Sequence, residues 1–278
     1  MWRNDGGMAL IGPVRERRGI PLRAVVPNAI TALALCSGLS GIRFAIAEDW
    51  DKAIAAIMIA AVLDGMDGRI ARMLKGQSRF GAELDSLSDV IAFGVSPAII
   101  MHLWALQYWP RFGWLFALAY AVCAALRLAR FNANIDVEDQ PHKSAGFLTG
   151  VPAPAGAGLM LLPVYVWIAT NRELDWLHNH YLVAGWAAIS AFLMISNLAT
   201  FSWGSIRLRR NVRFTAIVII ALVAGALVSA PWETLSVAAL LYAASIPFSI
   251  ASYGRVKRQR AAGLQRPEPA PSVPAPTA

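Results

Sequence analysis

Four aspartates lie in one short stretch of an otherwise apolar chain: Asp64, Asp67, Asp85 and Asp89. The first two are three residues apart and the last two are four apart, so each pair shares a face if its segment is helical. Carboxylates this close repel one another and are costly to bury, so a divalent cation is the expected compensator. All-oxygen ligands favour Mg²⁺ or Mn²⁺, or else Ca²⁺, over zinc.

Small residues accompany the aspartates. Gly68 and Ala71 follow the first pair along its helical face, and Gly81 precedes the second pair by one turn. Glycine weakens a helix, so its presence on these faces indicates open surface that a flat or phosphorylated ligand can approach. Arg72 can bind a phosphate group through two hydrogen bonds. Together these residues predict metal-assisted chemistry on a nucleotide diphosphate.

Long apolar segments must position these residues. Of 278 residues, 57% are hydrophobic and 15% are charged, whereas an average soluble domain has about 25% charged residues. A bilayer core needs about 20 apolar residues per helical span, and the sequence predicts an all-α polytopic membrane helix bundle of about eight transmembrane helices. The expected spans are 24–47, 50–75, 80–106, 112–133, 148–170, 180–201, 212–230 and 234–253.

The basic residues predict how these spans are oriented. With both termini on one side, 21 Lys and Arg residues fall on that side and four on the other. Cytoplasmic loops carry the excess of basic residues, so both termini and the turn after the second span are expected in the cytoplasm. An inner (cytoplasmic) membrane location follows. The net charge of +8 therefore indicates membrane orientation, and no nucleic-acid partner is expected.

The sequence divides into three regions: a basic N-terminal segment at 1–23, a transmembrane domain at 24–253, and a tail at 254–278. The tail is basic at first and then rich in Pro and Ala, so disorder is expected there. A polar, acidic loop is expected at 134–144. Cys36 and Cys123 lie inside apolar segments and are interpreted as packing residues.

Two other interpretations of the aspartates remain. They could be polar residues at a helix end, paired with nearby arginines. From a different functional class, they could line the ion path of a divalent-cation transporter. All four are expected in the cytoplasmic halves of two adjacent helices, which suits a one-sided reaction chamber better than a conduit. A calcium-binding EF-hand is excluded because the alternating ligands and the closing glutamate are missing.

The fixed residues from Asp64 to Asp89 resemble the motif of the CDP-alcohol phosphatidyltransferases. They match Asp-x₂-Asp-Gly-x₂-Ala-Arg-x₈-Gly-x₃-Asp-x₃-Asp at every defined position and every gap. The resemblance implies a helical membrane enzyme with two divalent ions, Mg²⁺ or Mn²⁺. Such an enzyme transfers a phosphatidyl group from a CDP-linked lipid to an alcohol and releases CMP. The resemblance also suggests a homodimer.

The resemblance also implies roles for single residues. The metal ligands would be Asp64, Asp67, Asp85 and Asp89. Asp89 would in addition be the catalytic general base on the acceptor hydroxyl. The residues that receive the cytidine diphosphate portion would be Gly68, Ala71, Arg72 and Gly81. Asn28 and Thr31 in the first span also fit the wider family, in which this segment lies near the nucleotide.

The motif does not specify the acceptor alcohol. Two segments, Leu126–Asn132 and Phe147–Pro154, are similar to segments of the bacterial phosphatidylserine synthases, which implies CDP-diacylglycerol and L-serine as substrates. Glycerol 3-phosphate, inositol phosphate or choline remain alternative acceptors. Serine carries a carboxylate that needs a cation, and Arg127 and Arg130 are candidates at the end of the fourth span. Their alternative role is anchoring of that span at the cytoplasmic surface.

Overall fold

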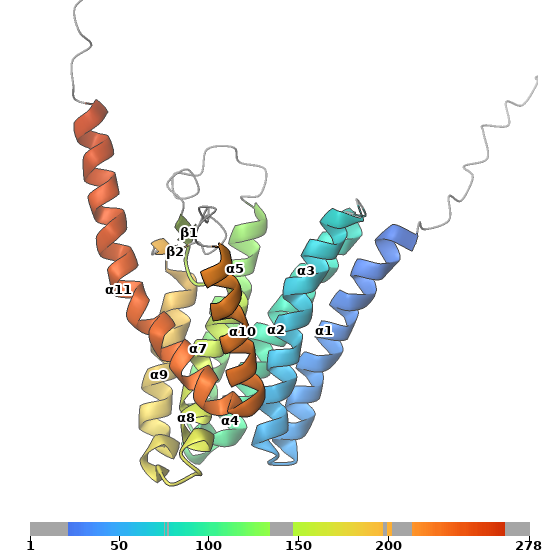
Figure 1. Cartoon of the computed structure of the whole chain (residues 1–278). Coiled ribbons are helices and arrows are strands. Elements are labelled where there is room, and N and C mark those ends of the chain that lie inside the picture. Colours follow the sequence, from blue (N-terminus) through green and yellow to red (C-terminus); the bar gives the residue numbers. More distant parts are fainter. Residues whose placement is uncertain are drawn as a thin grey trace, which may run out of the picture.

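The computed structural model describes residues 22–74, 76, 78–133, 147–196, 199–201 and 213–264, which form a helical bundle with one short two-stranded sheet (Figure 1). Residues 1–21, the loop predicted at 134–144 and the tail beyond 264 lie outside the described residues. The predominantly helical architecture expected from the sequence is confirmed.

The first half of the bundle contains α1 (Leu22–Ile46), α2 (Trp50–Met73), α3 (Arg79–Asp89), the π-helical turn η1 (Val90–Val95), α4 (Ser96–Trp104), the 3-10 turn η2 (Leu106–Tyr108) and α5 (Gly113–Ala133). These bounds agree closely with the first four predicted spans. Three of the described helices are long and apolar enough to cross a membrane: Val25–Ile46, Arg79–Trp104 and Gly113–Ala133. The third predicted span is therefore one continuous helix with a π-helical turn inside it.

The second half contains β1 (Phe147–Thr149), α7 (Ala153–Met160), α8 (Leu162–Ala169), the 3-10 turn η3 (Asp175–His178), α9 (His180–Ile195), β2 (Ala199–Phe201), α10 (Arg213–Ser229) and α11 (Pro231–Leu264). The two strands pair antiparallel, with Leu148 opposite Thr200. Neither strand was expected, since both positions were assigned to the ends of apolar spans. α11 also continues past the predicted end at 253.

The predicted span 148–170 differs most from the structure, because a strand and two short helices replace one long helix. The break falls at Leu161, between α7 and α8. Pro163 has no backbone N–H, so it cannot bond the carbonyl of Leu159 four residues earlier. The indole Nε1 of Trp186 in α9 donates to that carbonyl instead, at 2.6 Å. The carbonyl group that the helix break leaves without a backbone partner therefore accepts a hydrogen bond from a neighbouring helix.

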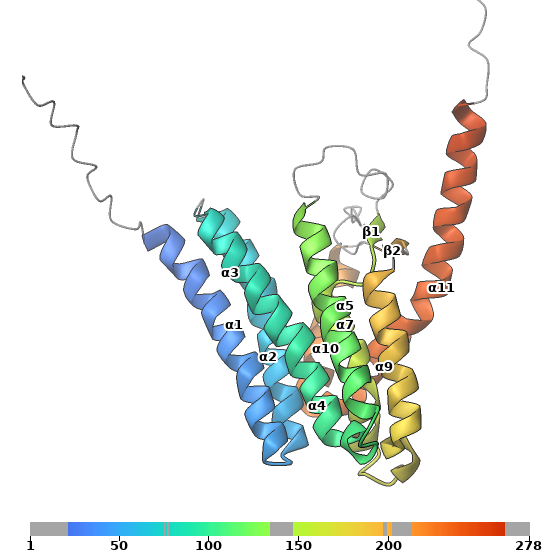
Figure 2. The ribbon, with the colours of Figure 1, turned by 180° about the vertical axis from the view of Figure 1, so that it is seen from behind.

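The helices spread apart toward one end of the bundle (Figures 1 and 2). α1, α2 and α3 lean strongly to one side at this end, α5 and α9 lean less, and α11 leans to the opposite side. The start of α1, the connection between α2 and α3, and the end of α11 all lie at the same end. The aspartates near this connection therefore lie toward the end at which α1, α2 and α3 separate from the other helices.

The turn η1 is the point at which α1 and α5 approach the third span most closely. A Cβ atom at Gly38 of α1 would lie 2.7 Å from the Cα and Cβ atoms of Ala92. On the other side, a Cβ at Gly94 would lie 3.0 Å from that of Ala124 in α5. The buried Tyr120 hydroxyl of α5 donates to the carbonyl of Phe93 at 3.1 Å. Two neighbouring helices thus hold this turn in place.

We expect Gly38→Ala to destabilise the fold because its new methyl group would overlap the backbone of η1. Overpacking of this kind costs about 1 to 3 kcal/mol, which exceeds the gain in helix propensity of about 1 kcal/mol. The midpoint of thermal unfolding in detergent should therefore fall. Gly185→Ala in α9 is the matched control, since a Cβ there meets no atom within 4 Å. If Gly38→Ala and Gly185→Ala unfolded at the same temperature, the close approach of Gly38 to Ala92 would be contradicted.

Candidate active site

Three of the four aspartates form a compact group of carboxylates. Asp64 and Asp67 come from α2 and Asp85 from α3, and one oxygen of each lies within 4.8 Å of the others. Asp67 is only 5% exposed, and Asp64 and Asp85 are half-buried. Like charges this close repel one another, and either a proton or a bound cation must compensate them. Oxygen ligands from carboxylates are those that Mg²⁺ and Mn²⁺ prefer, so the group fits a divalent ion.

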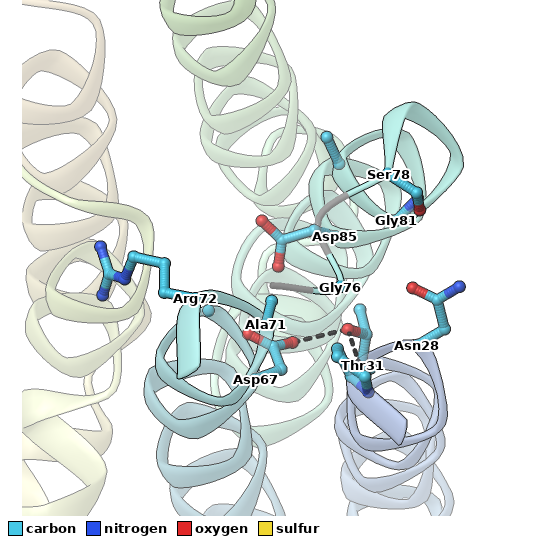
Figure 3. A pocket seen from close by; sticks show the side chains of 12 residues that line it. Asn28, Thr31, Asp67, Ala71, Arg72, Gly76, Ser78, Gly81 and Asp85 are labelled. Carbon is cyan, nitrogen blue, oxygen red and sulfur yellow. Dashed lines mark hydrogen bonds between the residues drawn. The ribbon is translucent and has the colours of Figure 1, made fainter. Parts of the chain in front are cut away.

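Thr31 orients one of these carboxylates. Its hydroxyl lies 2.6 Å from Oδ2 of Asp67, to which it donates (Figure 3). The backbone carbonyl of Thr31 accepts from the buried hydroxyl of Ser88 in α3 at 3.3 Å. A single residue of α1 therefore contacts both helices that carry the aspartates. Thr31 was expected near a nucleotide, and the structure gives it a direct contact with a candidate metal ligand.

Asp89 lies at the edge of the carboxylate group. Its side chain is in hydrogen-bonding contact with Asp64, but it does not belong to the group of three that share the 4.8 Å spacing. The turn η1 begins directly after it. Asp89 is thus adjacent to the candidate metal ligands.

A first cavity of about 550 Å³ opens between α1, α2 and α3 (Figure 3). Its lining includes every residue that the sequence predicted around a nucleotide, namely Asn28, Thr31, Gly68, Ala71, Arg72 and Gly81. Asp67 and Asp85 form its inner wall. Asn28 and Arg72 lie on opposite sides of these two carboxylates (Figure 3). The volume is in the usual range for small-molecule sites, about 300 to 1,000 Å³.

The glycines near the aspartates serve two different purposes. Cβ atoms at Gly65 and Gly68 would meet no atom within 4 Å, but only Gly68 lines the first cavity. At Gly81, a Cβ would lie 2.7 Å from Oδ1 of Asn28. Gly68 therefore leaves cavity surface open, as expected from the sequence. Gly81 instead allows α3 to approach α1 closely.

A second cavity, of about 690 Å³, lies on the other side of α3. Residues of α3, α5 and the start of α7 line it, namely Arg79, Ala82, Glu83, Asp85, Ser86, Asp89, Arg127, Leu128, Phe131, Asn132, Pro152, Ala153 and Pro154. Ala82 and Asp85 line both cavities, so α3 separates two chambers that meet at a candidate metal ligand. Asp89 lines the second cavity and does not line the first.

The two arginines predicted to face the acceptor have different environments. Arg127 lines the second cavity, and among the described residues its buried Nε atom has no hydrogen-bond partner. It is also near enough to Asp89 for electrostatic attraction. Arg130 lines neither cavity, and its Nη1 atom donates to the backbone carbonyl of Ile195 at the end of α9, at 3.0 Å. Of these two arginines, Arg127 is the one that lines a cavity.

Several polar residues of the second cavity were not singled out from the sequence: Arg79, Glu83, Ser86 and Asn132. Ser86 lies three residues before Asp89, so helical spacing alone could have placed it on the same face. Asn132 could not be found in this way. Its side chain reaches Ser86 only because α5 packs beside the third span.

Two family models match the chain. A model described as CDP-alcohol phosphatidyltransferase matches residues 24–203, and one described as CDP-alcohol phosphatidyltransferase 2 matches residues 212–247. The first match contains both cavities and all four aspartates.

Curated relatives from several bacteria are similar over long stretches. A Mycobacterium tuberculosis (H37Rv) protein is 38% identical over 243 residues, or 87% of this chain and 84% of the relative. A Mycobacterium leprae protein is 38% identical over 240 residues, with 85% and 77% covered. A Helicobacter pylori (J99) protein is 33% identical over 177 residues, with 62% and 70% covered. All three are named CDP-diacylglycerol–serine O-phosphatidyltransferase.

Proposed function

Because the chain belongs to the CDP-alcohol phosphatidyltransferase family, we propose that it transfers the phosphatidyl group of CDP-diacylglycerol to the hydroxyl of L-serine. The products are phosphatidylserine and CMP. The names of the relatives support this substrate pair. The observation that carries the proposal is the meeting of two cavities at α3. One cavity is lined by six of the eight fixed residues of the family motif, and the other contains Asp89 and Arg127.

The first cavity is the proposed donor site. The cytidine diphosphate portion contacts the open surface at Gly68 and Ala71, with Arg72 on its phosphates. Asn28 and Gly81 form the wall between α1 and α3. Apolar helix surface next to the cavity accommodates the acyl chains within the membrane.

In this proposal two divalent ions, Mg²⁺ or Mn²⁺, would be held by Asp64, Asp67, Asp85 and Asp89. Ions bound there would supply the positive charge that offsets the diphosphate and the departing CMP. Thr31 keeps the carboxylate of Asp67 turned toward the group through its 2.6 Å hydrogen bond. The compact spacing of the three carboxylates and the family's use of divalent metals support this assignment.

Asp89 is the proposed general base. It lines the second cavity, where the acceptor hydroxyl enters. Asp89 takes the hydroxyl proton as the serine oxygen forms its bond to the phosphorus of the phosphatidyl group. The bond between that phosphorus and the CMP oxygen breaks, and CMP leaves through the first cavity.

Arg127 binds the carboxylate of serine in this proposal. A half-buried guanidinium whose Nε donor has no partner among the described residues is suited to a carboxylate, which accepts two parallel hydrogen bonds from it. Arg130 is assigned a structural role at the contact between α5 and α9. This proposal gives the ligand-binding role to Arg127 and leaves the anchoring role to Arg130.

The chain is an integral membrane protein. We further propose eight spans, with both termini and the active site on the cytoplasmic face of the inner membrane. The excess of basic residues at the end that carries the site supports this orientation. The domain division into 1–23, 24–253 and 254–278 and the homodimer also remain proposals. Labelling of single engineered cysteines from each side of the membrane tests the orientation.

Release of CMP tests the acceptor. Purified protein with CDP-diacylglycerol and Mg²⁺ or Mn²⁺ should release CMP only when L-serine is supplied, and chelation of the metal should abolish release. Parallel reactions with glycerol 3-phosphate, inositol phosphate and choline are the controls. Equal release with one of these would reject serine and keep the family. Metal uptake into vesicles without any CMP release would favour the transporter alternative.

A further inference from the structure

The second cavity contains a hydrogen-bond acceptor that the roles assigned above leave unused. The amide nitrogen of Asn132 donates to the hydroxyl of Ser86 at 2.8 Å. That hydroxyl in turn donates to the carbonyl of Ala82, at 3.0 Å. A hydroxyl has one proton, so Ser86 donates to the carbonyl and accepts from the amide. This relay turns the NH₂ group of Asn132 toward α3 and leaves its amide oxygen available in the cavity.

An acidic side chain lines the same cavity. Glu83 lies on α3, three residues before Ser86 and therefore on the same helical face. It is exposed and lies outside the group of three metal-binding carboxylates. Besides the candidate metal ligands, the cavity lining thus has two cations, Arg79 and Arg127, one carboxylate, that of Glu83, and the neutral amide oxygen of Asn132. A ligand that carries both a carboxylate and an ammonium group matches this distribution.

We propose that the amide oxygen of Asn132, assisted by Glu83, binds the ammonium group of the acceptor amino acid. The inference rests on the proposed function and adds the residues that select the acceptor. Asn132 and Glu83 touch the substrate away from the reacting hydroxyl, so they determine specificity and take no part in proton transfer. An acceptor with a phosphate in place of the ammonium is disfavoured, since Glu83 repels it and the oriented amide oxygen cannot donate to it.

Two acceptors that differ only in the ammonium group test this assignment: L-serine and 3-hydroxypropanoate. Asn132→Leu should lower kcat/KM for L-serine about 10- to 100-fold, the usual effect of one charge-assisted hydrogen bond. The same variant should change kcat/KM for 3-hydroxypropanoate by only a few-fold. Asn132→Asp, which keeps acceptor oxygens, should retain the preference for serine. The KM for CDP-diacylglycerol should stay the same throughout.

Two further measurements separate this proposal from a structural role of Asn132. Glu83→Gln, at an exposed position where folding is not at risk, should reduce the serine preference by a smaller factor. Equal losses with both acceptors in Asn132→Leu, or the same loss in Asn132→Asp, would overturn the assignment. Unchanged serine preference in all three variants would do so as well. If the unaltered protein releases CMP without needing serine, the proposed function fails instead.

Discussion

Replacement of Asp89 by Asn should abolish serine-dependent CMP release while metal binding persists. Asn cannot accept the hydroxyl proton, and loss of a general base lowers kcat by about 10²- to 10⁴-fold. The three carboxylates of Asp64, Asp67 and Asp85 remain in Asp89→Asn, so the main metal-binding group is intact. Initial rates of CMP release and titration with Mn²⁺ measure the two effects separately.

The control for this variant is an acidic residue at the opposite end of the bundle. Asp51 forms an ion pair with Arg172 at 2.9 Å and lies far from both cavities. Asp51→Asn removes the same charge and should leave CMP release unchanged. Full turnover in Asp89→Asn would reject the base assignment. Loss of metal binding together with turnover would instead make Asp89 an essential ligand.

A valine at position 68 should block the donor cavity. Open space surrounds Gly68 on the cavity side, so the larger side chain fits the fold and occupies volume that the nucleotide needs. We expect kcat/KM for CDP-diacylglycerol to fall by about 100-fold, as for other steric exclusions from a shaped pocket. Steady-state CMP release over a range of CDP-diacylglycerol concentrations provides the measurement.

Gly65→Val is the matched control for Gly68→Val. Gly65 lies on the same helix, and a Cβ there also meets no atom within 4 Å, but Gly65 does not line the first cavity. Both variants have the same effect on helix propensity. Activity close to that of the unaltered protein is expected for Gly65→Val. Similar losses in both variants would point to a weakened α2 and against direct occlusion.

The local part of the site was predictable from the sequence. The spacing within each pair of aspartates places them on one helical face, and a short connection brings α2 and α3 together. That these carboxylates repel one another follows from their charge alone. The first four spans were predictable for a similar reason, since their apolar length sets their ends.

Contacts between distant segments account for what the sequence did not show. Helical spacing makes Arg127 and Arg130 equally good candidates for a ligand contact. The hydrogen bond of Arg130 to a backbone carbonyl depends on the packing of α9 beside α5, which the sequence does not show. Gly81 was interpreted as open surface because nothing in its own helix indicates the side chain of Asn28. The break at Leu161 was missed for a local reason: hydropathy does not record the missing N–H group of Pro163, although the sequence contains this residue.

The π-helical turn that follows Asp89 takes up one residue more than regular α-helix would need at this place. Its hydrogen bonds run from i to i+5, so the extra residue is absorbed within the turn and the helices on either side keep their relative direction. Deleting one residue between Val90 and Val95 would therefore restore regular α-helix and leave Asp85 and Asp89 facing their partners on α2. A deletion inside α4, which has no extra residue to lose, would instead rotate both carboxylates by about 100° about the helix axis relative to the apolar packing beyond it. The turn is thus a point of tolerance in the third span, where the length of the chain can change by one residue without redirecting the face that carries the aspartates.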